Sequence, residues 1–445
     1  MDADIRPPFT RTHAVSWPWP HGIHHVTVDD ITHVREIFGP TDDRLRAAKS
    51  AVFYTGLEAR QRLPQGMHDR GEEYVIANGT LHPRDAVGLA CHAPFHAKVI
   101  HVPFHHIHAG ETWDISVRHT AWPGLDHMEE LYVALRIDHL VLSHGARLIV
   151  QGNVLYADVG VIEREHPAAP RSPLTATSYD IGILPTPFSV DRPTSPHKGH
   201  PGAPGRSGAA GRDGTAVRVM GSALGPYIPD DSAAPSTSRD GGKGQHGDNG
   251  DPGQRGPNGG MCKMADMCFQ SLRGFQHTPL RLFTQAGTGG AGGYGGAGGH
   301  GGNGGRGGAG AHLHNTVLAP GSGGMGGDGG QGGNGGRGGN GGLSSNIFVT
   351  VSPRDHERVV GLSLPSSGGP GGRGGPGGMS GGGGSCGDRT FRVKATTHPS
   401  TPGHAPDGAP GQAGQAGRDG SPRPRAHIFL FTDSQLKKCL SHPVF

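Results

Sequence analysis

The chain is poor in the residues that build an ordinary globular core. Hydrophobic residues make up 33% and aromatic residues 6% of its 445 residues, which is too few for one conventional core that includes the whole chain. A chain of this length usually holds two or three domains. It contains no uninterrupted apolar run of about 18 residues, so the sequence predicts no membrane-spanning helix.

Cysteine is also scarce. The chain has five cysteines, an odd number at wide spacings, and such a set does not indicate a disulfide framework. The N-terminal segment MDADIRPPFTRTHAVSWPWP lacks the apolar stretch of a classical secretory signal. We therefore expect a protein that stays in the cytoplasm or leaves it by a non-classical route, and the sequence leaves the compartment open.

An excess of one charge and the common catalytic motifs are absent as well. The formal net charge is +3 without a long basic run, which argues against a nucleic-acid partner. No nucleophile elbow, P-loop, dinucleotide fingerprint or zinc-protease motif occurs. GxGxxG strings are present, but they follow from the glycine content and do not follow a nucleotide-binding strand. The sequence favours a protein that is not an enzyme, and we assign no catalytic residue.

Glycine, in contrast, is abundant, with 82 residues. Much of it recurs with a period of three, in six stretches that we call segments 1 to 6: 199–214, 244–260, 289–310, 323–342, 368–379 and 408–420. A constant period over so many segments is an internal repeat. Short apolar runs that are typical of strands separate the segments: 216–220, 280–284, 312–318, 346–351, 358–364, 389–395 and 427–432.

Three structures compete to explain the period of three. Glycine-rich linkers are usually flexible coil, although a linker needs no phase. A collagen-like triple helix requires Gly at every third position and three chains, and segments 1, 2 and 6 fit it, whereas segments 3 and 4 contain no proline. The third structure is a bundle of polyglycine-II helices within one chain, a backbone with three residues per turn and no internal hydrogen bonds.

The polyglycine-II hypothesis predicts which segments lie inside. A Gly-Gly-X repeat presents two bare faces to neighbouring backbones, whereas a Gly-X-Y repeat presents one. Segments 3, 4 and 5 are therefore predicted in the centre, and segments 1, 2 and 6 at the periphery along a single edge. The predicted core glycines are Gly292, Gly293, Gly301, Gly302, Gly329, Gly330, Gly335 and Gly336.

The stretch GGAGGYGGAGGHGGNGGRGG in segment 3 resembles known glycine-rich proteins. It is similar to the polyglycine-II bundles of springtail antifreeze proteins and to the glycine-rich domains of phage tail-fibre adhesins, over about half of the chain. The resemblance implies a backbone geometry. In the antifreeze group a flat face, often with Thr or Ala at the third positions, binds ice. In the adhesins comparable bundles display loops that bind a cell surface. Here the third positions include Tyr294, His300 and Arg306.

The N-terminal part has a different character. Residues 140–163 show apolar residues in short bursts separated by Gly or Asn, which suits either rungs of a β-solenoid or strands of a sandwich. We therefore predict a mainly β domain over 1–195, a polyglycine-II bundle interleaved with short strands over 196–432, a C-terminal tail over 433–445, and little α-helix.

Histidines crowd residues 92–108 in a chain that has 30 of them. His106 and His108 are two residues apart and share one side of a strand, and Glu111 follows. Imidazoles with a carboxylate can bind Zn²⁺, Ni²⁺ or Fe²⁺. The candidate ligands are His101, His106, His108 and Glu111. The alternative is a polar strand in a histidine-rich protein. Apart from such a divalent metal ion, we expect no cofactor.

The stretch MCKMADMC at 261–268 places several sulfur atoms close together. Thiolates and thioethers favour Cu(I), so Cys262 and Cys268 are candidate soft-metal ligands. The same pair is also a candidate for a small-loop disulfide, or the stretch is an apolar turn without chemistry.

Three hypotheses for function follow. The first is a structural or assembly protein, a rigid glycine-rich scaffold or self-associating subunit, with its own copies or a protein assembly as partner. The second is a binding module such as an adhesin, or an ice- or glycan-binding protein. The third is a metalloenzyme that uses the N-terminal histidine cluster.

Overall fold

The computed structural model describes residues 19–29, 94–126, 129–165, 175–188, 197–229, 239–313, 316–388, 403–432 and 435–439. These residues form β-strands, two 3-10 helices (His119–Ala121 and His356–Arg358) and extended segments, and no complete α-helix lies within the described ranges. The mainly β class expected from the sequence is therefore observed. In the same ranges, no helix has the length and apolar character needed to cross a membrane.

The larger sheet, sheet A, has eight strands in the order β1-β2-β4-β6-β10-β14-β16-β17. Neighbouring strands from β2 to β16 are parallel, while β1 and β17 pair antiparallel at the two edges. The bounds are β1 Gly22–Val28, β2 Phe95–Ile107, β4 Leu131–Leu142, β6 Val154–Arg164, β10 Ala265–Arg273, β14 Ile347–Val351, β16 Ile428–Thr432 and β17 Gln435–Cys439.

The smaller sheet, sheet B, has five strands in the order β15-β11-β7-β5-β3, all parallel to their neighbours. The bounds are β3 Thr112–Asp114, β5 Arg147–Gln151, β7 Ile181–Leu184, β11 Leu280–Gln285 and β15 Val359–Leu364. Along the chain, the strands of the two sheets alternate: β2, β4, β6, β10, β14 and β16 lie in A, and β3, β5, β7, β11 and β15 follow them in turn in B. We call each passage of the chain from one sheet to the other and back a return. Each return adds the next strand to each sheet.

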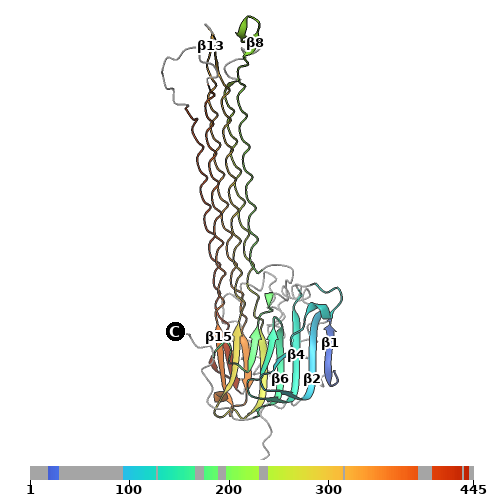
Figure 1. Cartoon of the computed structure of the whole chain (residues 1–445). Coiled ribbons are helices and arrows are strands. Elements are labelled where there is room, and N and C mark those ends of the chain that lie inside the picture. The colour runs from blue at the N-terminus through green and yellow to red at the C-terminus, as the bar shows by residue number, and fades with distance from the viewer. Residues whose placement is uncertain are drawn as a thin grey trace, which may run out of the picture.

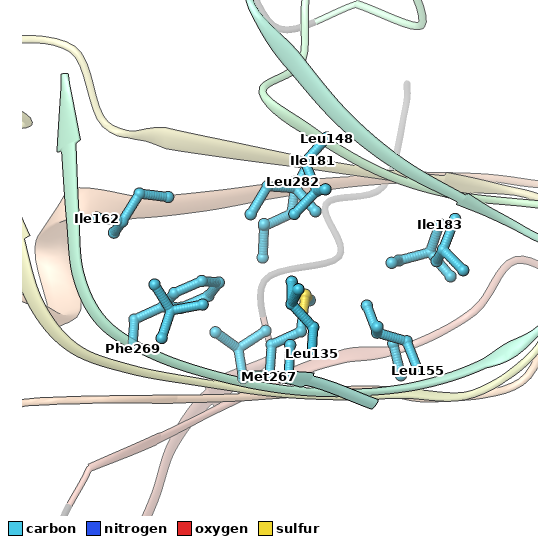
Figure 2. Close-up of a cluster of buried hydrophobic side chains, with 14 of the residues drawn as sticks. Leu135, Leu148, Leu155, Ile162, Ile181, Ile183, Met267, Phe269 and Leu282 are labelled. Carbon is cyan, nitrogen blue, oxygen red and sulfur yellow. The ribbon is translucent and has the colours of Figure 1, made fainter. Parts of the chain in front are cut away.

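The hydrophobic core lies between the two sheets (Figure 2). In sheet A, Leu135, Ala157, Met267, Val349 and Leu430 stand at the same level of consecutive strands, and all are buried. In sheet B, the buried Leu148, Ile181 and Leu282 stand level in the same way. Burial of one such Leu or Ile side chain contributes about 1.5–3 kcal/mol, so stacked rows of this kind hold the two sheets together.

The two sheets do not end at residue 195, where the sequence suggested a domain boundary. Strands β10, β11, β14, β15 and β16 all come from later residues and extend the same two sheets. The division into 1–195 and 196–432 therefore does not separate the β structure. Similarly, part of the predicted tail, Gln435–Cys439, forms β17 and pairs with β16.

The glycine segments interrupt the returns of the chain between sheet B and sheet A. Segments 1 and 2 lie between β7 and β10, segments 3 and 4 between β11 and β14, and segments 5 and 6 between β15 and β16. They extend side by side from the sheets to a far end, where β8 (Met220–Ser222) and β13 (Thr316–Leu318) lie (Figure 1). There β8 pairs with β9 (Gly225–Tyr227), and β12 (Ala311–Leu313) pairs with β13.

Backbone hydrogen bonds join neighbouring segments at every third residue. The N–H groups of Gly199 and Gly202 in segment 1 donate to the carbonyls of Ala291 and Tyr294 in segment 3, each at 2.8 Å. The same pattern joins three further pairs of segments in parallel: 3 and 5, 2 and 4, and 4 and 6. Segments that are consecutive in the sequence, from 1 and 2 to 5 and 6, are joined antiparallel. Segments 1, 3 and 5 therefore form one layer, and segments 2, 4 and 6 form the other.

The number of bonded neighbours follows the prediction for segments 3 and 4, whereas segment 5, predicted in the centre, and segment 2, predicted at the periphery, depart from it. Segments 3 and 4 each bond to four neighbours, segment 5 to three, and segments 1 and 6 to two. Segment 2, which we placed along a single edge, also bonds to three. Its glycine N–H groups donate to segment 4 while Gln254 accepts from Gly293 of segment 3 and donates to His200 of segment 1. A non-glycine position thus bonds through its backbone while its side chain stays outside.

The predicted core glycines occupy positions without room for a side chain. A Cβ atom added to any of them would lie 1.9–2.1 Å from a carbonyl oxygen of another segment. At Gly333, for example, the Cβ would lie 2.0 Å from the Asp251 carbonyl oxygen. Glycine is required at these positions because the backbones of adjacent segments approach closely.

Candidate functional site

Two parts of the molecule carry organised polar groups: the faces of the glycine rod, which we define as segments 1 to 6, and the histidine-bearing end of sheet A. On the rod, side chains at third positions accept backbone N–H groups of the next segment in the same layer. The Asn249 Oδ1 accepts the N–H of Gln331 at 2.8 Å, and the Asn258 Oδ1 accepts that of Asn340 at 3.0 Å. These contacts join segments 2 and 4 beyond their backbone bonds.

The same arrangement continues from segment 4 to segment 6. The Asn334 Oδ1 accepts the N–H of Gln415 at 2.8 Å, and the Asp328 Oδ1 accepts that of Ala409 at 2.7 Å. The Ala409 N–H is the largest influence that holds the pKa of Asp328 below its usual value, and His246 adds to it. On the other face, His300 of segment 3 accepts the N–H of Met379 at the end of segment 5, and Asn303 accepts the N–H of Gly382 just beyond it. Asn, Asp and His thus bond the amides that point out of the rod.

Proline stands at three levels where the facing third-position residue has no oxygen or nitrogen acceptor in its side chain. His300 is level with Met379 and Asn303 with Gly382, so the spacing of three places Ala297 level with Pro376 and Ala291 level with Pro370. Alanine has no acceptor, and proline has no N–H to satisfy. On the opposite face, Met325 is level with Pro406 in the same way, since Asp328 is level with Ala409.

The histidine cluster predicted from the sequence is divided in the structure. The His106 and His108 rings lie together, with centroids 4.4 Å apart. Glu111 accepts the backbone N–H of His108 at 2.8 Å. His101 instead lies near His21, with ring centroids 4.4 Å apart, and its Nδ1 is 3.1 Å from the Trp19 carbonyl oxygen. His101 is therefore not part of the His106–His108 group.

Sequence reasoning missed the carboxylate that approaches His106 most closely. The Glu165 Oε2 is 3.4 Å from the His106 Nε2, and the Ser143 hydroxyl lies 2.8 Å from the same nitrogen while donating to Glu165. Local spacing contains no signal for this contact, because parallel pairing of β2, β4 and β6 creates it. In the described ranges, no three His, Cys, Asp or Glu side chains form a group ready to hold a metal ion.

Two other histidines of β2 turn toward tryptophans. The His105 ring stacks on Trp113 at 3.8 Å, and the His96 ring meets Trp122 edge-on at 5.3 Å. Burial is the main cause that lowers the pKa of both histidines from the ordinary value. Both imidazoles are thus favoured in the neutral form by the packing around them.

The two candidate cysteines do not form a disulfide. Cys262 is buried, its thiol donates to the Ile183 carbonyl at 3.2 Å, and its Sγ lies 2.9 Å from the Thr284 Oγ1. Cys268 lies on β10 between Met267 and Phe269, which face the core, so it points to the opposite side of the sheet. Burial raises the pKa of Cys262 to about 12, which disfavours the thiolate that a soft metal would need.

No protein-family model and no curated protein matches the chain. Among solved structures, the chain is similar to a springtail antifreeze protein from Granisotoma rainieri, described as a bundle of nine polyproline type II helices. The identity is 22%, and the match covers 49% of this chain and 94% of the springtail chain. The TM-score is 0.08, which is too low to support an argument about shared fold or function.

Proposed function

We propose that this chain is a structural protein in which six polyglycine-II segments form a rigid rod on a β-solenoid base. The supporting observation is the regular hydrogen bonding of the segments, in which glycine N–H groups donate to other segments at every third residue. This is the period of a backbone with three residues per turn. Each such hydrogen bond contributes about 0.5–1.5 kcal/mol net, so many acting together offset the entropy lost by the glycines.

The rod gives the molecule reach. The steps from Gly199 to Val217, both bonded to segment 3, cover about 56 Å at roughly 3.1 Å per residue. The hairpins β8–β9 and β12–β13 lie at the far end of this length (Figure 1). A function as a spacer that holds these hairpins at a constant distance from the base accounts for both parts.

The base supports this proposal because each sheet continues into one layer of the rod. Strands β7, β11 and β15 lead into segments 1, 3 and 5, and segments 2, 4 and 6 lead into β10, β14 and β16. Neighbouring strands in a sheet stand about 4.8 Å apart, so the base delivers the segments at a separation suited to lateral hydrogen bonds. Contacts at the junction, such as Cys262 N–H to the Leu343 carbonyl at 2.9 Å, continue the pattern.

Amide hydrogen exchange of the intact protein tests the rigid rod. We expect the N–H groups of segments 3 and 4 to exchange as slowly as those of β6 and β10, because their acceptors lie in other segments of a packed bundle. Exchange at the rate of an unstructured chain throughout 289–342 would contradict the proposal and would instead indicate a flexible linker.

Self-association is a second candidate, supported by one edge of the rod. The N–H of Gly371 in segment 5 donates to Asp419 of segment 6, and just beyond the two segments the N–H of Gly383 donates to Asp407. Between them, Gly374 and Gly377 donate to no group in the described part of the chain. Unpaired backbone of this kind is a template for another chain, as at a sheet edge.

Size-exclusion chromatography with light scattering distinguishes the two candidates. Particles that grow with concentration from the 46.0 kDa monomer, and that disappear in Ala413→Arg, which places a long side chain on the neighbouring segment 6, would favour self-association. A monomer at all concentrations would leave the spacer function alone.

A further inference from the structure

Three arginines stand in one row across the rod face that segments 2, 4 and 6 form. They are Arg255, Arg337 and Arg418, one from each segment, and all three are exposed. The Gly256 N–H donates to the Arg337 carbonyl at 2.8 Å, and the Gly338 N–H donates to the Arg418 carbonyl at 2.9 Å. These bonds place the three arginines at one level. Because strands of the base stand about 4.8 Å apart, the row spans about 10 Å.

No carboxylate neutralises this row. None of the three arginines forms an ion pair in the described part of the chain. Asp328 of segment 4 stands three levels away and is paired with His246 at 3.1 Å. The Asp419 carboxylate accepts the Gly371 N–H of segment 5, in the other layer, at 2.7 Å. Like charges on neighbouring segments repel one another, and a bound anion relieves that repulsion.

The adjacent levels of the same face add hydrogen-bond donors. The Asn334 Oδ1 accepts the Gln415 N–H at 2.8 Å, and the Asn340 Oδ1 accepts that of Ser421 at 3.0 Å. Their oxygens are thus used within the rod, while their NH₂ groups donate to no group in the described ranges and remain for a ligand. The third positions one level to either side of the row hold no carboxylate and no aromatic ring: Pro252, Asn334, Gln415, Asn258, Asn340 and Ser421.

Two of the guanidinium groups are positioned by neighbouring side chains. The Arg255 Nη2 donates to the Asn258 Oδ1 at 2.9 Å, and the Arg337 Nη2 donates to the Ser421 Oγ at 3.4 Å. A guanidinium group has five N–H donors, so most of them stay available on the exposed side. Their planar arrangement matches two oxygens of one phosphate group.

We propose that the row of Arg255, Arg337 and Arg418 binds a chain of linked phosphate groups, as in inorganic polyphosphate. Consecutive phosphates of one chain can contact all three guanidinium groups, whereas a single phosphate ion is too small to span a row of about 10 Å. Recognition of a nucleotide or of single-stranded nucleic acid commonly uses an aromatic ring that stacks on the base. The adjacent third positions offer no such ring, which favours a phosphate chain without a nucleoside.

Isothermal titration of the intact protein with sodium tripolyphosphate tests this site. We expect one saturable site that is at least about tenfold weaker in Arg337→Gln, which removes the middle guanidinium and its charge-assisted hydrogen bonds. Arg373→Gln is the matched control, because Arg373 is an exposed third-position arginine of segment 5 in the other layer. It should leave the affinity within about twofold. Circular dichroism verifies that both variants are folded.

Two further ligands test the chemistry of the site. Orthophosphate should bind at least about tenfold more weakly than tripolyphosphate, because one phosphate gains nothing from linkage to a second and third. ATP carries the same three phosphates, with a nucleoside on one of them, and should bind no more tightly than tripolyphosphate. Tighter binding of ATP would overturn the choice of a phosphate chain without a nucleoside.

Two results with tripolyphosphate itself would overturn the site. Equal losses in Arg337→Gln and Arg373→Gln would indicate a general attraction to surface arginines. The lack of saturable binding by the folded wild-type protein would refute the site as well. If segments 3 and 4 of that protein still exchange their amide hydrogens slowly, the spacer proposal survives this failure, so the two proposals are tested separately.

Discussion

The Asn303 side chain accepts the backbone N–H of Gly382 at 2.9 Å, although 79 residues separate the two. This contact belongs to a set. On the other layer, Asn249 and Gln331 are bonded over 82 residues, and Asn334 and Gln415 over 81. Because each contact joins positions at the same level of the rod, third-position side chains select the register in which the segments lie against one another. Where a third-position side chain has no acceptor, a proline at the facing position can remove the backbone N–H donor instead.

Replacing a proline and then adding an acceptor at the facing position tests this relationship. Pro376 is level with Ala297, so Pro376→Ala creates an outward N–H without a side-chain acceptor and frees the unfolded chain, and we expect a loss of about 0.4–1 kcal/mol. Adding Ala297→Asn should recover part of the loss, because an asparagine at that level can accept the new N–H. Urea unfolding of both variants measures this, and an Ala297→Asn change that helps the wild-type protein equally would contradict it.

The glycine positions and their neighbours should differ greatly in tolerance. Gly333→Val places a branched side chain where even a Cβ lies 2.0 Å from the Asp251 carbonyl oxygen, whereas the Asn334 side chain is on the exposed side. We expect Gly333→Val to cost several times more stability than Asn334→Val, which loses about 1 kcal/mol with its hydrogen bond to Gln415. Thermal unfolding compares them, and similar losses would argue against close packing of the segments.

A buried ion pair joins the sheets at the end of β6. The Arg164 Nη2 is 2.7 Å from the Asp180 Oδ2, and both side chains are at most 2% exposed. The Asp180 carboxylate also accepts the Arg281 N–H at 2.9 Å. Arg164→Met leaves a buried carboxylate without its counter-ion, so we expect a loss of about 3–5 kcal/mol. In the exposed Arg306–Asp388 pair, Arg306→Met should cost less than about 1 kcal/mol; equal losses in chemical denaturation would refute the distinction.

Acid should destabilise the base through His96. Burial beside Trp122 lowers the pKa of His96, an effect that Glu129 and Asp29 oppose and His119 reinforces. Protonation is therefore easier in the unfolded chain, so the stability from neutral His96 is complete above the unfolded value of about 6.5 and decreases as the pH falls toward the lowered pKa. The difference in unfolding free energy between wild type and His96→Gln should shrink between about pH 7.5 and 5.5. A difference independent of pH would contradict this.

The sequence predicts individual elements better than their partners. The apolar runs 280–284, 346–351 and 358–364 lie within one residue of β11, β14 and β15, because strand patterning is a local property. The assembly of those strands with β5 and β6 into common sheets depends on pairing across long insertions, which no local pattern carries. For the same reason Glu165 was missed beside His106, and the alternation of β10 placed Cys268 away from Cys262.

The glycine period shows where local information reaches further. A repeat of three indicates which backbone faces carry no side chain. This was enough to predict that segments 3 and 4 have the largest number of hydrogen-bonded neighbours. It was not enough for segment 2, because the X-position amides that bond to segment 1 have the same chemistry whether or not a neighbour is present. The number of neighbours depends on the order of the strands in the two sheets, because this order determines which segments lie side by side.

Because the segments extend from the strands of the base, the width of the rod and its length depend on different parts of the sequence. Each return that carries glycine segments adds one strand to each sheet and one segment to each layer, at a sequence interval of about 80 residues between equivalent levels. Duplication of one such unit widens the rod by one column and leaves its reach unchanged. Insertion of three residues at the same level in every segment lengthens the rod by about 9 Å and leaves the base unchanged. The width and the length of the rod are therefore independent, and each can change during evolution without a change in the other.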